Sequence, residues 1–371
     1  MFRLNNLPSS DEDSPPSSPP PLKRPRLSPP ETSVPQSLAT NYRIYSWNCD
    51  DIAPYLPLPK VQNRISSYFG RVSPPLTAKN SKQSQWFIRN ILKNREWPEF
   101  LCLQEVKIAI TDKARINQAR EAAQLTEDND HGPEYEMYMN FPVVAKRPTQ
   151  NRRMYGVITY VRADIAKTIE KTRGVDWDDE GRVLILEMPR FALINLYAVN
   201  GTDSPYVVRS TGKTTGLTRH ERKRIFNNHL KDECLQLIRK GFEVCIVGDI
   251  NISRARIDSV PRLRSAIPHV LARKEFNESF LPETRLIDAW RERHGEDARG
   301  YTWYFRSARE GTDCARVDMI LCSKSLYQRT AEVEIEKWGG PMCGSDHTLM
   351  WIKIDGFNRT EGYKRTPVKK E

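Results

Sequence analysis

Two polar residues with different chemistry follow a short apolar segment in the middle of the chain. Val244–Val247 is apolar and largely β-branched, as expected of a strand buried inside a layered fold, and Gly248 ends it. Asp249 can carry charge and accept a proton, whereas Asn251 donates a hydrogen bond without titrating. Side chains two residues apart on an extended segment point to the same face. The segment predicts a polar pocket if other parts of the chain meet it, and an Asx turn if they do not.

Acid, amide and imidazole side chains recur at the ends of other predicted strands. Taken singly, each has an ordinary alternative as an Asx turn, a helix cap or a salt-bridged strand residue. Carboxylates bind hard ions such as Mg²⁺, and a histidine beside acids stabilises a phosphate or a leaving oxygen. The residues are Asn48, Asp50, Glu105, Asp318, Asp346 and His347. Together with Asp249 they predict metal-assisted hydrolysis of a phosphodiester, and the serine or thiol setting of a covalent hydrolase is lacking.

The charge balance favours a polyanionic partner. The chain has 371 residues, with 58 Lys and Arg against 47 Asp and Glu, which gives a net charge of +11. This balance favours nucleic acid over a membrane, although a basic globular protein without such a partner is also consistent with it. No segment is apolar enough to span a bilayer or to form a signal peptide. The seven cysteines are scattered and fit no zinc-binding spacing, which indicates reduced thiols of an intracellular protein.

Composition predicts one long ordered region between two tails. Residues 1–40 are rich in Pro and Ser and are predicted to be disordered, and residues 357–371 form a basic tail. The cluster Lys23-Arg24-Pro25-Arg26 in the first tail is compatible with a nuclear import signal and predicts a nuclear protein. No linker divides residues 41–356, so a single catalytic domain is expected there.

Strands and helices alternate along this region. Apolar runs and apolar–polar alternation predict strands over Tyr42–Trp47, Phe100–Leu103, Gly156–Val161, Val183–Met188, Phe191–Tyr197, Val244–Val247, Tyr301–Phe305, Val317–Cys322 and Thr348–Ile354. Helical spacing or helix-prone composition predicts helices over residues 81–95, 111–131, 219–240 and 270–280, and residues 201–218 are predicted to form a polar loop. The pattern indicates a layered α/β domain with a site at one sheet edge.

The order of the motifs resembles that of the endonuclease/exonuclease/phosphatase superfamily. The resemblance spans residues 42–356 and rests on Trp47-Asn48, Leu103-Gln104-Glu105, Gly248-Asp249-Ile250-Asn251 and Ser345-Asp346-His347. Further segments are similar to the exonuclease III branch, which holds the major abasic-site endonucleases: Pro98–Ile108, Tyr155–Val157, Asn195–Asn200, Tyr301–Trp303 and Arg316–Asp318. The resemblance implies a DNase I-like four-layer α/β sandwich, with two mainly antiparallel sheets packed between helices. It also implies cleavage of DNA 5′ of abasic sites or cleaning of blocked 3′ ends, in base excision repair, with Mg²⁺ or Mn²⁺ as cofactor.

The resemblance implies roles for the acidic residues. Asp50 and Glu105 would bind the metal, with Asn48 supporting it and Asp346 beside it. Asp249 would orient or deprotonate the attacking water.

It also implies how the scissile phosphate is held. Asn251, Asn200 and Tyr197 would bind this phosphate, although Tyr197 also fits an ordinary packed strand position. His347, steadied by Asp318, would polarise the phosphate.

Basic and aromatic residues near the motifs are candidates for contact with DNA. Tyr155 is predicted to wedge or stack on a base. A phosphate-tracking rim is predicted from the arginines in the adjoining loops, which are Arg152, Arg153, Arg254, Arg256, Arg262 and Arg264. The alternative for each single arginine is a solvated loop charge.

Two positions depart from the family pattern. Asp51 stands where the family usually has Gly, which adds a charge near the metal. The damage pocket of this branch is commonly walled by two aromatic residues; Trp303 matches one, but Ala315 stands at the other position. The second departure predicts a pocket with one wall missing, which is larger, less selective or unsuited to an abasic sugar.

Alternative functions stay open from the sequence. One is another phosphoesterase of the superfamily, acting as a tyrosyl-DNA phosphodiesterase, an RNA deadenylase or a phosphoinositide phosphatase. Another is a nucleic-acid-binding module without catalysis, which the complete set of acidic and histidine positions disfavours. The expected partner is DNA, with RNA as an alternative, and the protein is expected to be a monomer without membrane contact.

Overall fold

Two six-stranded sheets form the centre of the protein. The computed structural model describes residues 40–57, 87–124, 130–142, 155–307, 309, 311–338 and 344–357. These belong to one compact unit, Leu38–Glu371. The predicted tails at residues 1–40 and 357–371 lie outside the described residues, except for the strand residues Thr40 and Phe357.

The first sheet has the strand order β16-β17-β1-β2-β4-β3. These strands are β16 (Thr330–Ile335), β17 (Met350–Phe357), β1 (Thr40–Asn48), β2 (Phe100–Gln104), β4 (Val157–Arg162) and β3 (Tyr135–Asn140). The second sheet has the order β12-β15-β10-β7-β6-β5. Its strands are β12 (Ile287–Asp288), β15 (Asp318–Cys322), β10 (Glu243–Asp249), β7 (Phe191–Tyr197), β6 (Val183–Met188) and β5 (Lys171–Arg173). The pairs β1–β2 and β10–β7 are parallel and the other neighbours in both sheets are antiparallel, which confirms mainly antiparallel sheets.

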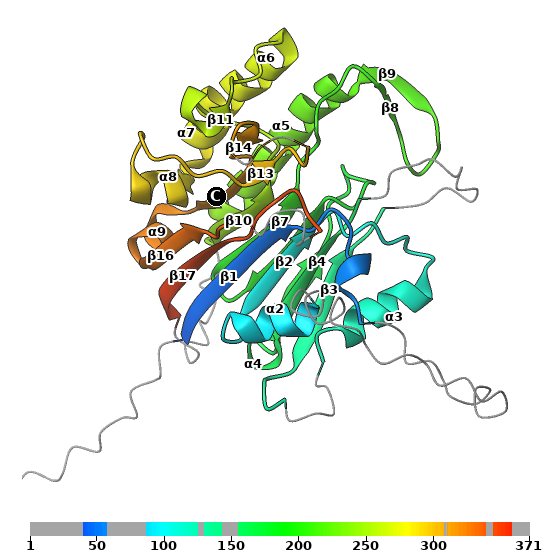
Figure 1. Ribbon diagram of the computed structural model, residues 1–371, viewed down its shortest axis with the longest axis vertical. Helices are drawn as coiled ribbons and strands as arrows, with labels where there is room; N and C mark the ends of the chain where they lie inside the picture. The colour runs from blue at the N-terminus through cyan, green and yellow to red at the C-terminus, as the bar shows by residue number, and fades with distance from the viewer. Residues whose placement is uncertain are drawn as a thin grey trace, which may run out of the picture. The chain divides into compact units, whose positions relative to one another are not determined.

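The two sheets pack face to face and helices cover their outer faces. Strand β2 shows why: all five of its residues are buried, and they alternate between two environments. Phe100 and Cys102 join the core between the sheets, whereas Leu101 and Leu103 join a second core under the first helical layer. That layer contains α2 (Ile88–Asn94) and α3 (Lys113–Glu121), which lie over the β1–β2–β4 face in Figure 1.

The outer face of the second sheet is covered by a long helix and its neighbours. Helix α5 (Arg219–Arg239) packs there with the π-helical turn η4 (Phe276–Phe280), and α6 (Ile267–Glu275), which precedes η4, packs against α5. Thr218 accepts a hydrogen bond from the Glu221 backbone, and the Glu221 side chain accepts one from the Thr218 backbone, so a capping box fixes where α5 begins. The resulting helix–sheet–sheet–helix order confirms the predicted four-layer α/β sandwich.

Several shorter elements join these layers. A small sheet of β11 (Ser259–Val260), β14 (Cys314–Ala315) and β13 (Trp303–Tyr304) borders the end of β10. The short helices are η1 (Ala53–Tyr55), α4 (Ala163–Ala166), η3 (Arg256–Asp258), α7 (Leu281–Thr284), α8 (Ala289–His294) and α9 (Lys324–Gln328). Among the described residues, no helix has the length and apolar character needed to cross a membrane. The six described cysteines are all free and buried, as expected of reduced thiols.

The predicted loop over residues 201–218 is partly wrong. It contains a polar hairpin of β8 (Pro205–Val207) and β9 (Thr214–Thr218), whose residues are largely exposed and so give no apolar alternation. The predicted helix over residues 81–95 is seen only in part, because residues 81–86 lie outside the described residues. The predicted helix over residues 111–131 is too long: α3 ends at Glu121, and the described residues 122–124 and 130–131 are not helical. The predicted 270–280 helix begins at Ile267 and changes to π-helix at Phe276.

Candidate active site

The site lies where the two central parallel strand pairs end. Asn48 is the last residue of β1 and pairs with Gln104, the last residue of β2, so Glu105 emerges beside it. In the other sheet, the last residue of β10 is Asp249, which pairs with both Tyr197 and Asp318. Parallel strands end at the same edge, and the face-to-face packing of the sheets brings both edges together. Residues more than 200 positions apart in sequence therefore meet.

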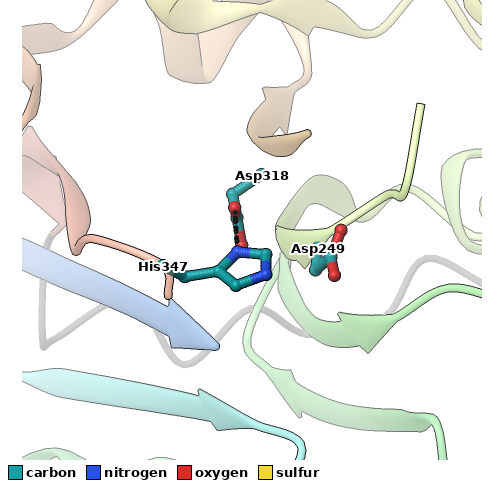
Figure 2. Close-up of side chains that lie close together, drawn as sticks. All are labelled: Asp249, Asp318 and His347. Carbon is teal, nitrogen blue, oxygen red and sulfur yellow. Dashed lines mark hydrogen bonds and ion pairs between the residues drawn. The ribbon is translucent and has the colours of Figure 1, made fainter. Parts of the chain in front are cut away.

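His347 lies between two buried carboxylates. Its Nδ1 is 2.7 Å from Asp318 Oδ2, and Figure 2 shows its ring between Asp318 and Asp249. One ligand-type atom from each of these three residues lies within 4.8 Å of the others, and all three residues are buried. This geometry brings together three residues that the motifs predicted to act in one site.

Asn48 connects this group to Glu105. Its Nδ2 donates to Asp249 Oδ2 at 3.1 Å and to Glu105 Oε1 at 3.4 Å, and it lies 3.4 Å from His347 Nε2. Ser345 fixes the geometry from outside: its hydroxyl donates to the Asn48 carbonyl at 2.6 Å and accepts from the His347 backbone at 2.9 Å. Asn48 thus holds three functional groups in one arrangement without adding charge.

Burial and neighbouring charges change the proton affinity of two site residues. Burial, together with the nearby Asp318 carboxylate, raises the pKa of Asp249 to about 7. Burial alone would lower the pKa of His347, but the negative charges of Asp318 and Asp249 outweigh it and raise that pKa to about 10. At neutral pH the imidazole is therefore a cation, and Asp249 titrates where a general base is most effective.

The backbone is strained at the residues that turn into the site. Asp50, Glu105 and Asn251 have φ angles of 58°, 52° and 57°, in the left-handed region that residues other than Gly rarely adopt. Such conformations persist where the surrounding structure holds them, and they concentrate at functional sites. Gly248 has φ 134°, and a Cβ there would lie 1.9 Å from the Leu196 carbonyl oxygen. Only glycine therefore allows β10 to reach Asp249 beside β7.

The carboxylates of Asp50 and Glu105 converge on one position that suits a cation. Lys107 Nζ lies 2.5 Å from Asp50 Oδ1 and 3.5 Å from Glu105 Oε2, and Arg306 also forms an ion pair with Asp50. Asp346 is close by, with an oxygen 3.8 Å from Arg306 Nη2. Hard oxygen donors gathered around a positive charge fit a divalent cation such as Mg²⁺. The predicted metal ligands thus lie together, with a lysine beside them.

The Asp249–Asp318–His347 group is a less suitable metal site, although its atoms lie close together. A histidine must be neutral to bind a metal, and here His347 is held protonated by its hydrogen bond to Asp318. The charge of the imidazolium already compensates the two carboxylates. Such a group can exchange protons and can place a positive charge beside a phosphate.

The residues predicted to hold a phosphate line one cleft of about 550 Å³, together with the acidic residues. Its walls include Asn200, Tyr197 and Asn251. Asn251 Nδ2 donates to Asp249 Oδ2 at 3.1 Å and to the Ala198 carbonyl at 3.0 Å, which aligns the amide with the carboxylate. Burial, followed by the negative charge of Glu105, raises the pKa of Tyr197 above its usual value, so its hydroxyl remains protonated as a hydrogen-bond donor.

The prediction that Tyr155 stacks on a base is wrong. Tyr155 is buried in the core between the sheets, and the guanidinium of Arg182 lies 3.8 Å from its ring centroid. Arg182 also lies over the Tyr197 ring at 4.6 Å and pairs with the buried Glu180. The ring face that a base would need is occupied, so Tyr155 supports Tyr197 from behind.

Two predicted rim arginines bind their own chain. Arg254 pairs with Asp288 at 2.7 Å and donates to Asn277 at 3.1 Å. Arg256 donates to the carbonyls of Ser259 and Pro261, both at 2.8 Å. Neither is among the residues that line the cleft, so these two arginines shape the loop after β10 and are not phosphate contacts in this arrangement. Arg262 and Arg264 do line the cleft.

The other two predicted rim arginines are Arg152 and Arg153. Both lie outside the described residues, and their contact with DNA remains a prediction.

The side of the cleft where a damage pocket is predicted has one aromatic wall and one open side. Trp303 Nε1 donates to Asp346 Oδ2 at 3.1 Å, and Ala315 lies opposite Trp303 in the strand register. Phe305 is 49% exposed, lines the same cleft, and its ring lies 6.3 Å from that of Trp303. An aromatic pair therefore faces the space in front of the small side chain of Ala315.

Sequence reasoning missed two supporting residues. The Thr302 hydroxyl accepts hydrogen bonds from the backbones of Val317 and Asp318, both at 3.0 Å, and so positions Asp318. Lys223, on α5, is buried and donates to the Asn251 carbonyl at 2.6 Å. Burial lowers the pKa of Lys223 to about 7. Its position on a charged helix gave no signal, because its neighbours Arg222 and Arg224 are also basic.

Comparison with known proteins identifies the family of this chain. A model of the Endonuclease/Exonuclease/phosphatase family matches residues 45–347. The DNA-(apurinic or apyrimidinic site) endonuclease 2 of Schizosaccharomyces pombe is 26% identical over 188 residues, 48% of this chain and 33% of that protein. The DNA repair nuclease APEX1 of Danio rerio is 26% identical over 274 residues, 71% of this chain and 76% of that protein. The chain thus spans about a third of the first relative and three quarters of the second.

Solved structures share the fold. The AP endonuclease LMAP from Leishmania major has a TM-score of 0.58 at 18% identity, covering 85% of this chain and 87% of that chain. The 3′ phosphatase NExo from Neisseria, solved with a product DNA hairpin, has a TM-score of 0.54 at 18% identity, covering 85% and 99%. Because the family model matches most of the chain, as the motifs predicted, this protein belongs to the Endonuclease/Exonuclease/phosphatase family.

Proposed function

We propose that this protein is a divalent-metal-dependent nuclease of DNA repair that hydrolyses phosphodiesters at abasic sites or at blocked 3′ ends. The observation that carries the proposal is the position of Asp249, buried and hydrogen-bonded by Asn48, beside the His347–Asp318 pair. The relatives named as abasic-site endonucleases and DNA repair nucleases support the choice of DNA as substrate.

Asp249 is the group that activates water. One of its oxygens accepts from the Asn251 backbone at 2.7 Å, and the other accepts from two amides, so both oxygens are fixed in direction. A carboxylate with a pKa near 7 takes a proton from water more readily than an ordinary aspartate does. The water oxygen forms a bond to phosphorus while its proton passes to Asp249.

The amides and Tyr197 hold the phosphate for this attack. Asn251, Asn200 and Tyr197 all line the cleft next to Asp249. Asn200 and Tyr197 carry neutral hydrogen-bond donors, whereas both amide hydrogens of Asn251 already bind Asp249 and the Ala198 carbonyl, so Asn251 would reach the phosphate only by giving up one of these bonds. Neutral donors orient the phosphate oxygens without neutralising Asp249. Fixed donors of this kind lower the barrier because they need no rearrangement as charge develops.

His347 stabilises the negative charge that builds on the phosphate. Its protonated ring is held by Asp318, and its Nε2 side faces Asn48. The P–O3′ bond breaks as the water attacks. The leaving 3′ oxygen takes up a proton from solvent water and becomes a 3′-hydroxyl, and the phosphate remains on the other product. Asp249 returns the proton that it accepted to solvent.

Asp50 and Glu105 are the residues that would hold a divalent metal ion, with Asp346 and Asn48 beside it. When bound, Mg²⁺ or Mn²⁺ would supply Lewis-acid stabilisation of the phosphate and its leaving oxygen. The convergence of these carboxylates on Lys107 supports this assignment.

A nuclear location and a monomeric state complete the proposal. A DNA substrate and the basic cluster Lys23-Arg24-Pro25-Arg26 support the nucleus, although this cluster lies outside the described residues. A fluorescent fusion followed in cells, with the Lys and Arg residues of the cluster changed to Ala, tests the location.

A cleavage assay tests the function. Purified protein is incubated with Mg²⁺ or with EDTA and four labelled substrates: a duplex with an abasic analogue, a nicked duplex with a blocked 3′ end, an undamaged duplex and a single-stranded RNA. The Asp249→Asn and His347→Gln variants are compared with wild type, and Lys274→Gln serves as a surface control because Lys274 is 64% exposed.

We expect wild type and Lys274→Gln to cleave a damaged duplex with Mg²⁺ only, and both site variants to be strongly impaired. Equal activity of wild type and the two site variants would contradict the assigned site. If only the RNA were cleaved, the substrate would be RNA and not DNA.

A further inference from the structure

One wall of the cleft is cationic, and the chemistry above does not use it. Lys223 comes from α5, Arg264 from the loop before α6, and His269 and Arg273 from α6. All four line the same cleft as Asp249. Two separate segments, α5 and the stretch from Arg264 through α6, thus send positive or protonatable groups to one side of the site.

The lysine and the two arginines of this wall differ from their neighbours in their ion pairs. In the part of the chain that the structure describes, no carboxylate forms an ion pair with Lys223, Arg264 or Arg273. Next to them, Arg224 pairs with Glu275 and Lys274 pairs with Glu278. The helices therefore place their acidic partners away from the cleft and leave its wall positive.

The positive charges of this wall lie close enough to His269 to keep its ring neutral at neutral pH. Burial, together with Arg264, Lys223, His220 and Arg273, lowers the pKa of His269 to about 4. The ring of His220 packs edge-on against His269, 4.7 Å between centroids. Asp249 is the acidic group that acts on Lys223, and Asp203 acts on His220. A cluster of like charges held in a cleft is stabilised when an anion enters it.

The position of Lys223 indicates which anion this is. Its Nζ donates to the Asn251 carbonyl at 2.6 Å, while the Asn251 side chain faces Asp249 on the other side. The cationic wall therefore begins directly behind the residue that would hold the scissile phosphate. The next phosphate of the same strand is the anion that geometry offers here.

We propose that Lys223, Arg264, His269 and Arg273 form a second phosphate subsite, which binds a phosphate of the cleaved strand next to the scissile one. This inference rests on the proposed function, since it requires a nucleic-acid strand in the cleft. Two sources supply the same chemistry: an internal backbone linkage and a terminal phosphate at a strand end. Arg–phosphate contacts are charge-assisted and fix the strand in register.

Binding measurements on a cleavage-deficient protein test the subsite. All proteins carry Asp249→Asn, and their affinity for a labelled duplex with an abasic analogue is measured by fluorescence anisotropy at several salt concentrations. Arg273→Gln and Arg264→Gln remove one charge each, and Lys274→Gln on the same helix is the matched control. Thermal unfolding confirms that each variant is folded.

Three further duplexes identify the phosphate. Two carry a neutral methylphosphonate at the linkage on one or the other side of the scissile phosphate. The third is nicked and ends in a terminal phosphate at the same place.

We expect each arginine variant to weaken binding of the all-phosphate duplex about tenfold and to lower the salt dependence by about one ion, with the control unchanged. On one of the two methylphosphonate duplexes, the protein with both arginines intact should bind about tenfold more weakly than on the all-phosphate duplex. The arginine variants should lose no further affinity on that duplex. If the arginine substitutions weaken binding of the nicked duplex only, the subsite binds a terminal phosphate at a strand end.

Unchanged affinity of both arginine variants would contradict the subsite. An equal loss of affinity on every duplex would also contradict it, because it would show a long-range effect of charge and no contact with one phosphate. The proposed function is tested by a different result. It would be contradicted if the protein with native Asp249 did not cleave DNA in the presence of Mg²⁺, regardless of what the arginine variants bind.

Discussion

The imidazole of His347 is held by Asp318, whose Oδ2 lies 2.7 Å from Nδ1 in a fully buried setting. The pair joins a strand of the second sheet to a loop that follows β16 of the first, so the packing of the sheets sets their distance. Asp318 thereby decides both the orientation of the ring and its charge.

Replacing Asp318 tests this relationship. Asp318→Asn removes the charge that holds the pKa of His347 at about 10, so the ring loses its proton at a lower pH. We expect kcat to fall about 10²-fold or more at neutral pH and to decline further as pH rises, whereas wild type keeps a charged ring up to about pH 10. The pH profile of kcat for both proteins is the measurement. Parallel profiles, offset by a constant factor, would show that Asp318 does not control this charge.

Replacing Asp249 should lower the activity and raise the thermal stability above pH 7. The folded-state pKa of Asp249, about 7, lies above its ordinary value, so the folded protein binds more protons than the unfolded chain between those two values. Stability from this group is complete below the ordinary pKa and is lost as pH rises through 7. Asp249→Asn should lower kcat by about 10² to 10⁴-fold.

The same variant should melt at a higher temperature than wild type at pH 8, and this difference should vanish near pH 4. Thermal unfolding at both pH values measures it. A variant that is less stable than wild type at pH 8 would mean that burial does not penalise the Asp249 carboxylate.

Removing Lys107 should strengthen metal binding. Lys107 Nζ lies between the carboxylates of Asp50 and Glu105, where it competes with a divalent ion for the same oxygens. We expect Lys107→Gln to melt at a lower temperature without metal, and to show half-maximal stabilisation at lower Mg²⁺ or Mn²⁺ concentration than wild type. Melting curves across a metal titration provide a readout that is independent of cleavage. Weaker metal binding by the variant would assign Lys107 a supporting role instead.

Filling the open side of the cleft should narrow the range of lesions. Ala315 lies opposite Trp303, and an indole at this position would occupy space beside Phe305. We expect Ala315→Trp to reduce cleavage of a bulky 3′ adduct about tenfold relative to that of an abasic analogue. Comparing kcat/KM for the two substrates measures the change. An unchanged ratio would show that Ala315 does not border the bound lesion.

The sequence predicted the central strands and most of the site, and for a physical reason. Buried strands such as Phe100–Leu103 and Val244–Val247 are continuous apolar runs, and the acids that end them stand out against those runs. The family resemblance then indicated which of these ends meet. The structure adds that the ends of β1 and β2 in one sheet lie beside the ends of β7 and β10 in the other.

The misses follow from contacts that a linear pattern does not record. Tyr155 and Arg254 look like surface ligands, but their partners, Arg182 and Asp288, are distant in sequence. Lys223 resembles any lysine of a charged helix until its carbonyl partner on Asn251 is known. Polar edge strands such as β5 and β9 carry no apolar period and therefore give no signal.

The most direct test of the central claim is the origin of the oxygen in the product phosphate. Cleavage of an abasic-analogue duplex in water enriched in ¹⁸O, followed by mass spectrometry, distinguishes hydrolysis at phosphorus from elimination at the sugar. If Asp249 activates water, wild type yields a 3′-hydroxyl and a phosphate carrying one ¹⁸O, and Asp249→Asn yields almost no product. A product phosphate without ¹⁸O, or labelled product formed equally well by Asp249→Asn, would contradict this assignment.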